Sequence, residues 1–242
     1  MIDSAYDFRS DSNGKDPDKY SATLRRYHQL LWSKPLPNGS PFDLDTITPY
    51  AYLHHASNLG EFVLTSDSFI PSYAGWSRKQ ALLNEVGWER VDAFRSLAYT
   101  IGGMIVFPGN RVGRFQTING ARGFNTAIAD RMDLTLECIR LHYAGASSPL
   151  EAVLGRYGDF FDLFTDFSGY VEFFLLQDLV DGDKIRFFLP SDGFTRPASP
   201  LDVDSYEEYM NQSMAFVQAR NERISRWATS HQRDKTATYS AT

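Results

Sequence analysis

The stretch that decides the fold is YAYLHHASNLGEFVLTSDSF, residues 50–69. It is rich in β-branched and aromatic residues, and the turn-forming residues SNLG (57–60) interrupt it. Two such runs joined by a short turn predict a β-hairpin. The hairpin provides two neighbouring strands around which the other segments can be placed.

A helix is predicted on the N-terminal side of this hairpin. Asp16 is a good N-cap, Pro17 suits the first helical position, and Pro35 ends the pattern. Apolar residues recur at helical spacing between these two prolines. The proline-rich residues 34–49 then form a loop that leads into the hairpin.

Short strands and helices alternate after the hairpin. MIVF (104–107), FQTI (115–118) and KIRFFLP (184–190) have the composition of strands. The predicted helices cover residues 77–86, 88–99, 123–145, 150–167 and 205–228. Hairpin-connected strands flanked by helices indicate an α+β fold with a mixed or antiparallel sheet.

The length of 242 residues predicts a single domain. We expect this domain to span residues 16–228, between a polar N-terminal arm (1–15) and a disordered tail (229–242). A net charge of −6 argues against general nucleic-acid binding, and against a transferase that acts on nucleic acid, because phosphate neutralisation needs a basic surface. A local basic pocket remains compatible with this charge.

The composition also bears on location. Cys138 is the only cysteine, so the chain has no intramolecular disulfide, and a reducing cytoplasmic location fits best. The N-terminus has no apolar signal-peptide core, and no stretch approaches 18 uninterrupted apolar residues. We therefore expect a soluble protein without a membrane span.

The most unusual charges lie in TINGARGFNTAIADRMDLTLECIR, residues 117–140. On a continuous helix starting near Gly123, its charged residues fall in one sector roughly 80° wide. These residues are Asp130, Asp133, Glu137 and Arg140. Because like charges four residues apart repel each other, Asp133 and Glu137 need a nearby cation. In the simpler interpretation, the charges pair with neighbouring arginines and fix the turn to the helix.

The second interpretation is a binding site for a small anionic ligand, such as a nucleotide or a phosphate. Gly120 and Gly123 permit close backbone approach, and the helix N-terminus offers N–H groups to an anion. The candidate ligand-binding side chains are Arg111, Arg114, Asn119, Arg122, Asn125 and Arg140. Glu137 or Asp133 would act as general base or electrostatic group. The turn matches no phosphate-loop or dinucleotide motif, and no cofactor is indicated.

Two other acidic features have alternative explanations. Asp159, Asp162 and Asp166 recur at helical spacing, which is typical of a solvated face and only secondarily of a Mg²⁺ site. Asp67, in the Ser-Asp-Ser triplet at the end of the hairpin, is either an exposed acid or a turn former.

A functional alternative to ligand binding is a regulatory or defence-associated interaction module that meets a protein partner through its aromatic and acidic surface. The exposed residues 190–200 would then contribute to the interface.

Several stretches together resemble a bacterial family of unknown function. They are TIGGMIVFPGN (100–110), TINGARGFN (117–125), DRMDLTLECIRLHY (130–143), RYGDFFDLFTDFSGYVEFFLLQDLV (156–180) and IRFFLPSDGF (185–194). The resemblance extends from LRRYHQLLWSKPLPNG (24–39) to RNERISRW (220–227). It implies a single-domain cytoplasmic bacterial protein and brings no activity or catalytic residue with it.

Overall fold

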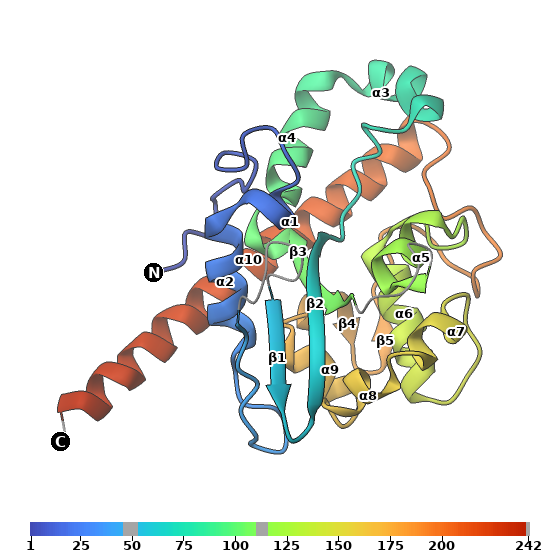
Figure 1. Ribbon diagram of the computed structural model, residues 1–242. Helices are drawn as coiled ribbons and strands as arrows, with labels where there is room; N and C mark the ends of the chain where they lie inside the picture. The colour runs from blue at the N-terminus through green and yellow to red at the C-terminus, as the bar shows by residue number, and fades with distance from the viewer. Residues whose placement is uncertain (46–52, 110–115, 241–242) are drawn as a thin grey trace.

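The predicted hairpin forms the centre of a three-stranded antiparallel sheet with the strand order β1-β2-β3 (Figure 1). In the computed structural model, which describes residues 1–45, 53–109 and 116–240, β1 spans Leu53–Ser57 and β2 spans Gly60–Ser68. β3 (Met104–Pro108) pairs with the second half of β2. A second sheet consists of β4 (Val180–Asp181) and β5 (Lys184–Ile185). The predicted α+β class, with an antiparallel sheet and a single domain, is confirmed.

Helical segments surround the larger sheet. They are α1 (Pro17–Tyr20), α2 (Ala22–Trp32), η1 (Ser77–Lys79), α3 (Gln80–Val86), α4 (Trp88–Ala98), η2 (Ile101–Gly103), α5 (Ile118–Phe124), α6 (Met132–Tyr143), α7 (Glu151–Gly155), α8 (Gly158–Asp162), α9 (Phe167–Phe173), η4 (Gln177–Leu179) and α10 (Val203–Ser240). α10 crosses the whole molecule diagonally in Figure 1. Within the described ranges, no helix combines the length and the apolar character that crossing a lipid bilayer requires.

The predicted first helix is divided at Ser21. Asp16 caps α1 as expected, because its side chain accepts from the Asp18 N–H. Ser21 then adopts an extended conformation, ends α1 and caps α2 by accepting from the Leu24 N–H at 3.0 Å. Serine competes with the helix for backbone donors, which explains why one predicted helix becomes two.

The prediction of one helix over residues 123–145 is wrong. α5 begins at Ile118, where Thr117 caps it by accepting from the Gly120 N–H, so FQTI is not a strand in its described part, residues 116–118. Asn125 ends α5, and α6 starts only at Met132. Asp130 therefore lies in a loop and shares no helical face with the charges of α6.

Other predicted boundaries also moved. The helix expected over residues 150–167 is divided into α7 and α8, with the weak helix formers Gly155 and Gly158 at the break. Residues 167–173 form α9. The strand expected over residues 184–190 is only two residues long.

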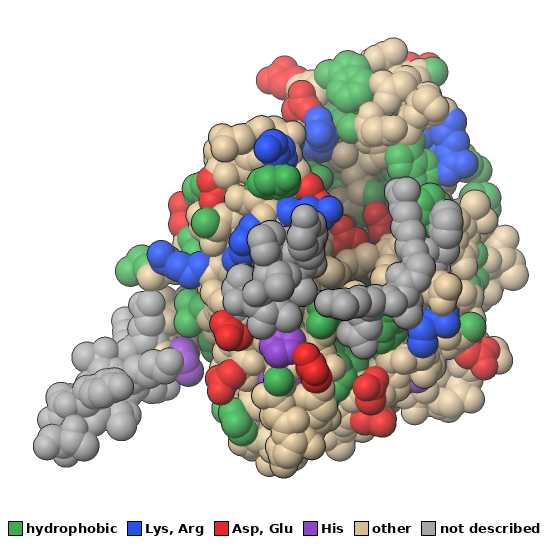
Figure 2. Space-filling model, viewed as in Figure 1, with side chains coloured by type: hydrophobic (Ala, Val, Ile, Leu, Met, Phe, Trp, Pro, Cys, Tyr) green, Lys and Arg blue, Asp and Glu red, His purple; other side chains and the backbone are tan. Residues whose placement is uncertain are grey.

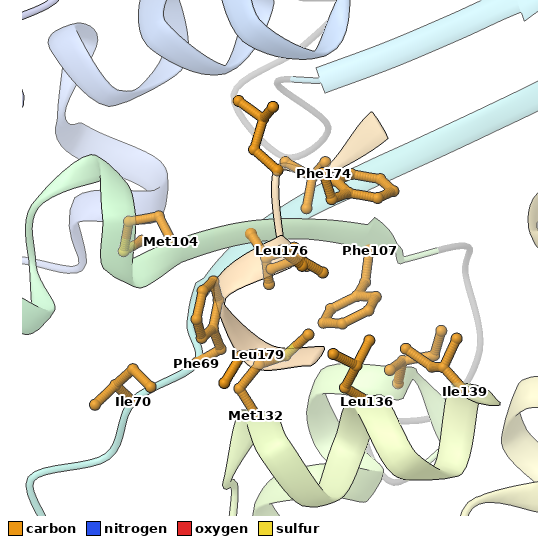
Figure 3. Packing of buried hydrophobic residues seen from close by; sticks show 14 of the residues in the cluster. Phe69, Ile70, Met104, Phe107, Met132, Leu136, Ile139, Phe174, Leu176 and Leu179 are labelled. Atoms are coloured by element: carbon orange, nitrogen blue, oxygen red, sulfur yellow. The ribbon is translucent and has the colours of Figure 1, made fainter. Parts of the chain in front are cut away.

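One layer of the core lies between β3 and α6. Met132, Leu136 and Ile139 follow one another at i, i+4 and i+7 and point from α6 toward Phe107 of β3 and Leu179 (Figure 3). All five side chains are buried. Burying each apolar side chain contributes about 1.5–3 kcal/mol, so this layer fixes α6 against the sheet.

α10 is anchored by Arg220, whose side chain is fully buried. The guanidinium donates to the carbonyls of Gly102, Met104 and Phe174 at 2.9 Å each and to that of Leu175 at 3.2 Å. Two of these carbonyls lie at the end of α9, where the last turn of a helix leaves acceptors unpaired. Burial lowers the Arg220 pKa to about 9. One side chain thus joins α10, the start of β3 and the end of α9.

The N-terminal arm packs on the domain through Phe8, which is fully buried and whose N–H donates to the Tyr99 carbonyl. The boundaries of the arm and of the tail stay predictions.

Candidate functional site

Asp67 lies near the end of β2, where successive side chains point to opposite faces. Ser66 is buried and contacts Nε2 of His28 through its Oγ at 2.7 Å. Asp67 points the other way, and its Oδ2 accepts from Nη1 of Arg122 at 3.3 Å. Because Asp67 is in register with Ile105 of β3, the sheet fixes the position of its carboxylate.

Arg122 of α5 is fully buried, and each of its guanidinium nitrogens has a partner. Nε donates to Thr135 Oγ1 at 2.9 Å, and Nη2 donates to the Asp130 carbonyl at 2.9 Å. Nη2 also lies 3.2 Å from Oδ1 of Asp130. The guanidinium therefore joins the carboxylates of Asp67 and Asp130 and is itself closed to solvent.

The loop between α5 and α6 holds Asp130 in a conformation that is rare outside glycine. The φ angles of Ala129 and Asp130 are +46° and +64°. The Asp130 N–H donates to the Arg122 carbonyl at 3.0 Å, and the Tyr73 hydroxyl donates to the Ala129 carbonyl at 3.2 Å. A left-handed residue with a side chain costs about 1–2 kcal/mol, and such residues persist where their surroundings enforce them. These contacts fix Asp130 next to Asp67.

The two carboxylates line a pocket of about 340 Å³, here called the Asp67 pocket. Its wall comes from the end of β2, the loop after it, α4 and the loop that carries Asp130. The other large side chains of the wall are Tyr73, Trp76, Arg95 and Tyr99. Figure 2 shows acidic side chains inside a recess on this face of the molecule. Asp67 and Asp130 are 35% and 27% exposed, whereas Arg122 is not exposed, so a ligand would meet the carboxylates first.

The pocket raises the pKa of both carboxyl groups. For Asp67, burial is the largest cause, the charge of Asp130 adds to it and Arg122 opposes it, which gives a pKa of about 7. Burial also raises the pKa of Asp130 against the effect of Arg122. A carboxyl group with a pKa near 7 both donates and accepts protons at neutral pH. The site can therefore bind hydrogen-bond donors and exchange a proton with them.

A third aspartate, Asp18 of α1, lies close to this pair. Burial raises its pKa well above the ordinary value, and the charges of Asp67 and Asp16 add to the effect, while hydrogen bonds from Ser66 oppose it. Among the described residues, its Oδ1 is buried without a hydrogen-bond partner. The acidic character of the Asp67 region thus extends to α1.

His28 and Ser66 do not form a nucleophile and base. Trp32 Nε1 donates to His28 Nδ1 at 2.6 Å, so the proton of the neutral ring is on Nε2, which donates to Ser66 Oγ. Burial lowers the His28 pKa to about 3, which keeps the ring neutral. Because Nε2 already carries its proton, it cannot accept the proton of the Ser66 hydroxyl.

Asp133, a catalytic candidate from the sequence, is fully buried on α6 and paired with Arg131. Nε of Arg131 donates to Oδ1 at 3.0 Å and Nη2 donates to Oδ2, which also accepts from the Phe188 N–H at 2.8 Å. Arg131 donates in addition to the Ala198 carbonyl at 2.8 Å. The pair therefore connects α6 to the segment after β5, and a catalytic role for Asp133 stays a prediction.

Glu137, the other catalytic candidate, pairs with Arg140 three residues later. Both guanidinium–carboxylate hydrogen bonds measure 2.7 Å, and the two side chains are 17% and 29% exposed. They lie together on α6 and do not line the Asp67 pocket. Their roles as base and ligand contact stay predictions.

The other candidate ligand contacts are dispersed. Asn119 donates to Thr65 Oγ1 at 3.1 Å, and the Asn125 amide makes hydrogen bonds of 2.9 and 3.2 Å within neighbouring loops. Arg111 and Arg114 lie outside the described residues. Of the predicted ligand-binding residues that the structure describes, Arg122 is the one that contacts the acidic pair of the pocket.

The acidic series of residues 159–166 is not on one continuous helix. Asp159 and Asp162 belong to α8, whereas Asp166 caps α9 by accepting from the Gly169 N–H at 2.8 Å. In the described parts of the chain, no group of three or more His, Cys, Asp or Glu residues is arranged to hold a metal ion.

The comparisons with known proteins give a family. No curated protein and no solved structure matches the chain. The profile of a family of unknown function (DUF6994) matches residues 2–224, a range that contains every residue of the Asp67 pocket. The resemblance noted in the sequence is thereby confirmed, and the chain belongs to the family of unknown function DUF6994.

Proposed function

We propose that the chain binds a small amine-bearing ligand in the Asp67 pocket and exchanges a proton with it through Asp67. The observation that carries the proposal is the pair of partly exposed carboxylates, Asp67 and Asp130, held on the buried guanidinium of Arg122. Two carboxylates around one cation leave a negative charge unbalanced, and an ammonium group would balance it.

The proposed ligand can also carry the anionic group that was predicted from the sequence. Arg122 is buried with its donors engaged by protein groups, whereas Arg95 lines the pocket with a side chain that is 37% exposed and whose Nη1 lies 3.4 Å from the exposed Asp92 carboxylate. A ligand with an ammonium group at Asp67 and a carboxylate or phosphate at Arg95 would use both charges. The volume of about 340 Å³ suits a small molecule of this kind.

Proton exchange follows from the same geometry. With a pKa of about 7, Asp67 is divided between its acid and base forms at neutral pH. An enzyme of this design would use Asp67 as general acid or base and Asp130 to hold the ligand's ammonium group. A cytoplasmic location in a bacterium belongs to the proposal too, supported by the single, buried Cys138 thiol.

A thermal-shift screen tests the proposal with three ligand sets: zwitterionic amines, simple amines and anions such as nucleotides. At 100 times its Kd, a ligand stabilises the fold by about 2.7 kcal/mol. At roughly 2.1 cal/mol/K of unfolding entropy per residue, this raises the Tm of the 242-residue chain by about 5 °C. The zwitterionic set should give the largest shifts.

Two substitutions and a matched control assign the site. Asp67→Asn and Asp130→Asn should abolish the shift, whereas Asp181→Asn, an exposed aspartate on β4, should leave it unchanged. If anions alone bind, and bind Asp67→Asn as well as the wild-type chain, the anion site predicted at residues 111–140 replaces this proposal; Glu137→Gln then tests that site. If no set raises the Tm, the interaction module is favoured.

A further inference from the structure

Lys34 follows Ser33, the C-cap of α2, and lines a second pocket, which shares no residue with the Asp67 pocket. Its Nζ donates to the Phe173 carbonyl at the end of α9. Three aromatic rings surround the same nitrogen, with centroids 5.3 Å (Trp32), 4.9 Å (Phe173) and 5.5 Å (Trp227) away. The amine is therefore held in one place by side chains and backbone from α2, α9 and α10.

The Lys34 pocket has a volume of about 530 Å³, which is enough for a small organic molecule. Its apolar wall includes Leu36, Phe173 and Trp227, and the Trp227 ring stacks on His231 with centroids 5.0 Å apart. Glu172 and Gln177 supply polar groups. Such a wall suits a ligand with a flat apolar body and one polar end.

The charges facing Lys34 determine its protonation. Burial is the main cause that lowers the pKa of its ammonium group to about 7; the charge of Arg220 on α10 adds to this, and Glu172 on α9 opposes it. His231 of α10 lines the same pocket. At neutral pH a large share of Lys34 is thus an uncharged amine, the form that reacts with electrophiles.

We propose that Lys34 forms an imine with a small aldehyde or ketone that has an aromatic or apolar body and is bound in this pocket. The lone pair of the neutral amine attacks the carbonyl carbon, and a proton moves from nitrogen to oxygen to give a carbinolamine. Loss of the hydroxyl group as water, with the second nitrogen proton, then gives the C=N bond. One water is released for each imine formed, and no oxidant or reductant takes part.

The neighbouring groups have defined roles in this step. Before the attack, one N–H of the neutral amine donates to the Phe173 carbonyl, which orients the nitrogen toward the pocket. This hydrogen bond is lost when the second nitrogen proton leaves. Glu172, which lines the pocket and acts as a carboxylate, accepts a proton from the nitrogen and passes it to the hydroxyl group, which leaves as water. This inference does not depend on the function proposed for the Asp67 pocket, because the two sites have separate residues.

Reductive alkylation of the full chain with benzaldehyde and cyanoborohydride tests the proposal, since the reductant traps any imine. Peptide mapping by mass spectrometry compares Lys34 with Lys184, which is exposed, and with Lys79, which is buried but lines neither pocket. At pH 7 we expect Lys34 to be labelled roughly 10- to 100-fold faster than Lys184, because far more of it is neutral. Lys79 should be labelled slowest.

The pH dependence of the labelling rate distinguishes a Lys34 amine that is largely neutral at pH 7 from an ordinary lysine that is merely accessible to the reagent. The labelling rate of Lys34 should level off above about pH 7, following the value at which its amine is half neutral. Glu172→Gln should move this midpoint to lower pH and slow the reaction, whereas Glu151→Gln, an exposed glutamate on α7, should change neither. Lys34→Met should lose the fast label.

The wild-type comparison needs no variant, so it is decisive even if Lys34→Met does not fold. Labelling of Lys34 no faster than that of Lys184 overturns the proposal. So does a rate that keeps rising above pH 9, because the amine would then have the protonation of an ordinary lysine.

Discussion

Replacing Asp133 by asparagine distinguishes a structural ion pair from a catalytic base or electrostatic group. The substitution keeps the shape of the side chain and removes its charge, which leaves the Arg131 guanidinium buried with carbonyl partners alone. Breaking a buried ion pair by removing one partner costs about 3–5 kcal/mol. With about 2.1 cal/mol/K of unfolding entropy per residue, the 242-residue chain should lose roughly 6–10 °C in Tm.

Differential scanning calorimetry at pH 7 measures this loss, and Glu137→Gln is the matched control on the same helix. The Glu137–Arg140 pair is partly exposed and local, so its removal should cost at most about 1 kcal/mol, or roughly 2 °C. The double variant Arg131→Met/Asp133→Leu should recover much of the loss, because apolar residues often replace a buried pair without cost. If Asp133→Asn melts within 2 °C of the wild type and instead loses ligand binding, the structural interpretation is refuted.

Three further predictions concern stability. Arg220→Met should lower the free energy of unfolding by more than about 3 kcal/mol in urea titrations, because it leaves four buried carbonyls without their donor. Gly103→Ala should lower the Tm strongly, because the added Cβ would collide with the Ala98 carbonyl. Gly123→Ala is the control: its added Cβ has no heavy atom within 4 Å, so it should be neutral or stabilise α5 by up to about 1 kcal/mol. The raised pKa of Asp67 stabilises the fold below about pH 4, and this contribution is lost as pH rises through 7. The Tm of Asp67→Asn minus the Tm of the wild type should therefore increase between pH 5 and pH 8. A Tm difference that stays the same over this pH range would contradict the assigned pKa.

Local patterns predicted the elements whose geometry depends on neighbouring residues. The hairpin was recognisable because its turn and its strand residues are contiguous, and β3 because a short apolar run ends at Pro108. The break between α5 and α6 was not recognisable in this way. It is held by Tyr73, which lies 56 residues from Ala129, and a helical wheel assumes that no such distant contact interrupts the helix. Long-range contacts overrode the helical periodicity here.

The same limit explains what was found of the candidate site. Arg122 was one of several arginines predicted to contact a ligand, but its partner Asp67 lies 55 residues away in a strand. Aspartate is depleted in strands, and its presence in the run before Phe69 was the available signal. Turn formation explained that residue equally well from the sequence. Only the antiparallel register of β2 and β3, together with the loop at Asp130, brings the carboxylates to one guanidinium.

The partners of three buried arginines explain why we propose a ligand site in the Asp67 pocket, where negative charge is left unbalanced. Arg220 donates to carbonyls, and Arg131 is matched one to one by the fully buried Asp133. Both arrangements satisfy the guanidinium inside the protein and leave no charged partner exposed. Arg122 is different, because it has two carboxylates and both reach solvent. Their excess negative charge must be relieved by a proton on Asp67 or by a bound cation. A cationic ligand would displace that proton. Its affinity should therefore depend on pH in the range where Asp67 titrates, near the pKa of about 7 that the pocket gives this carboxyl group.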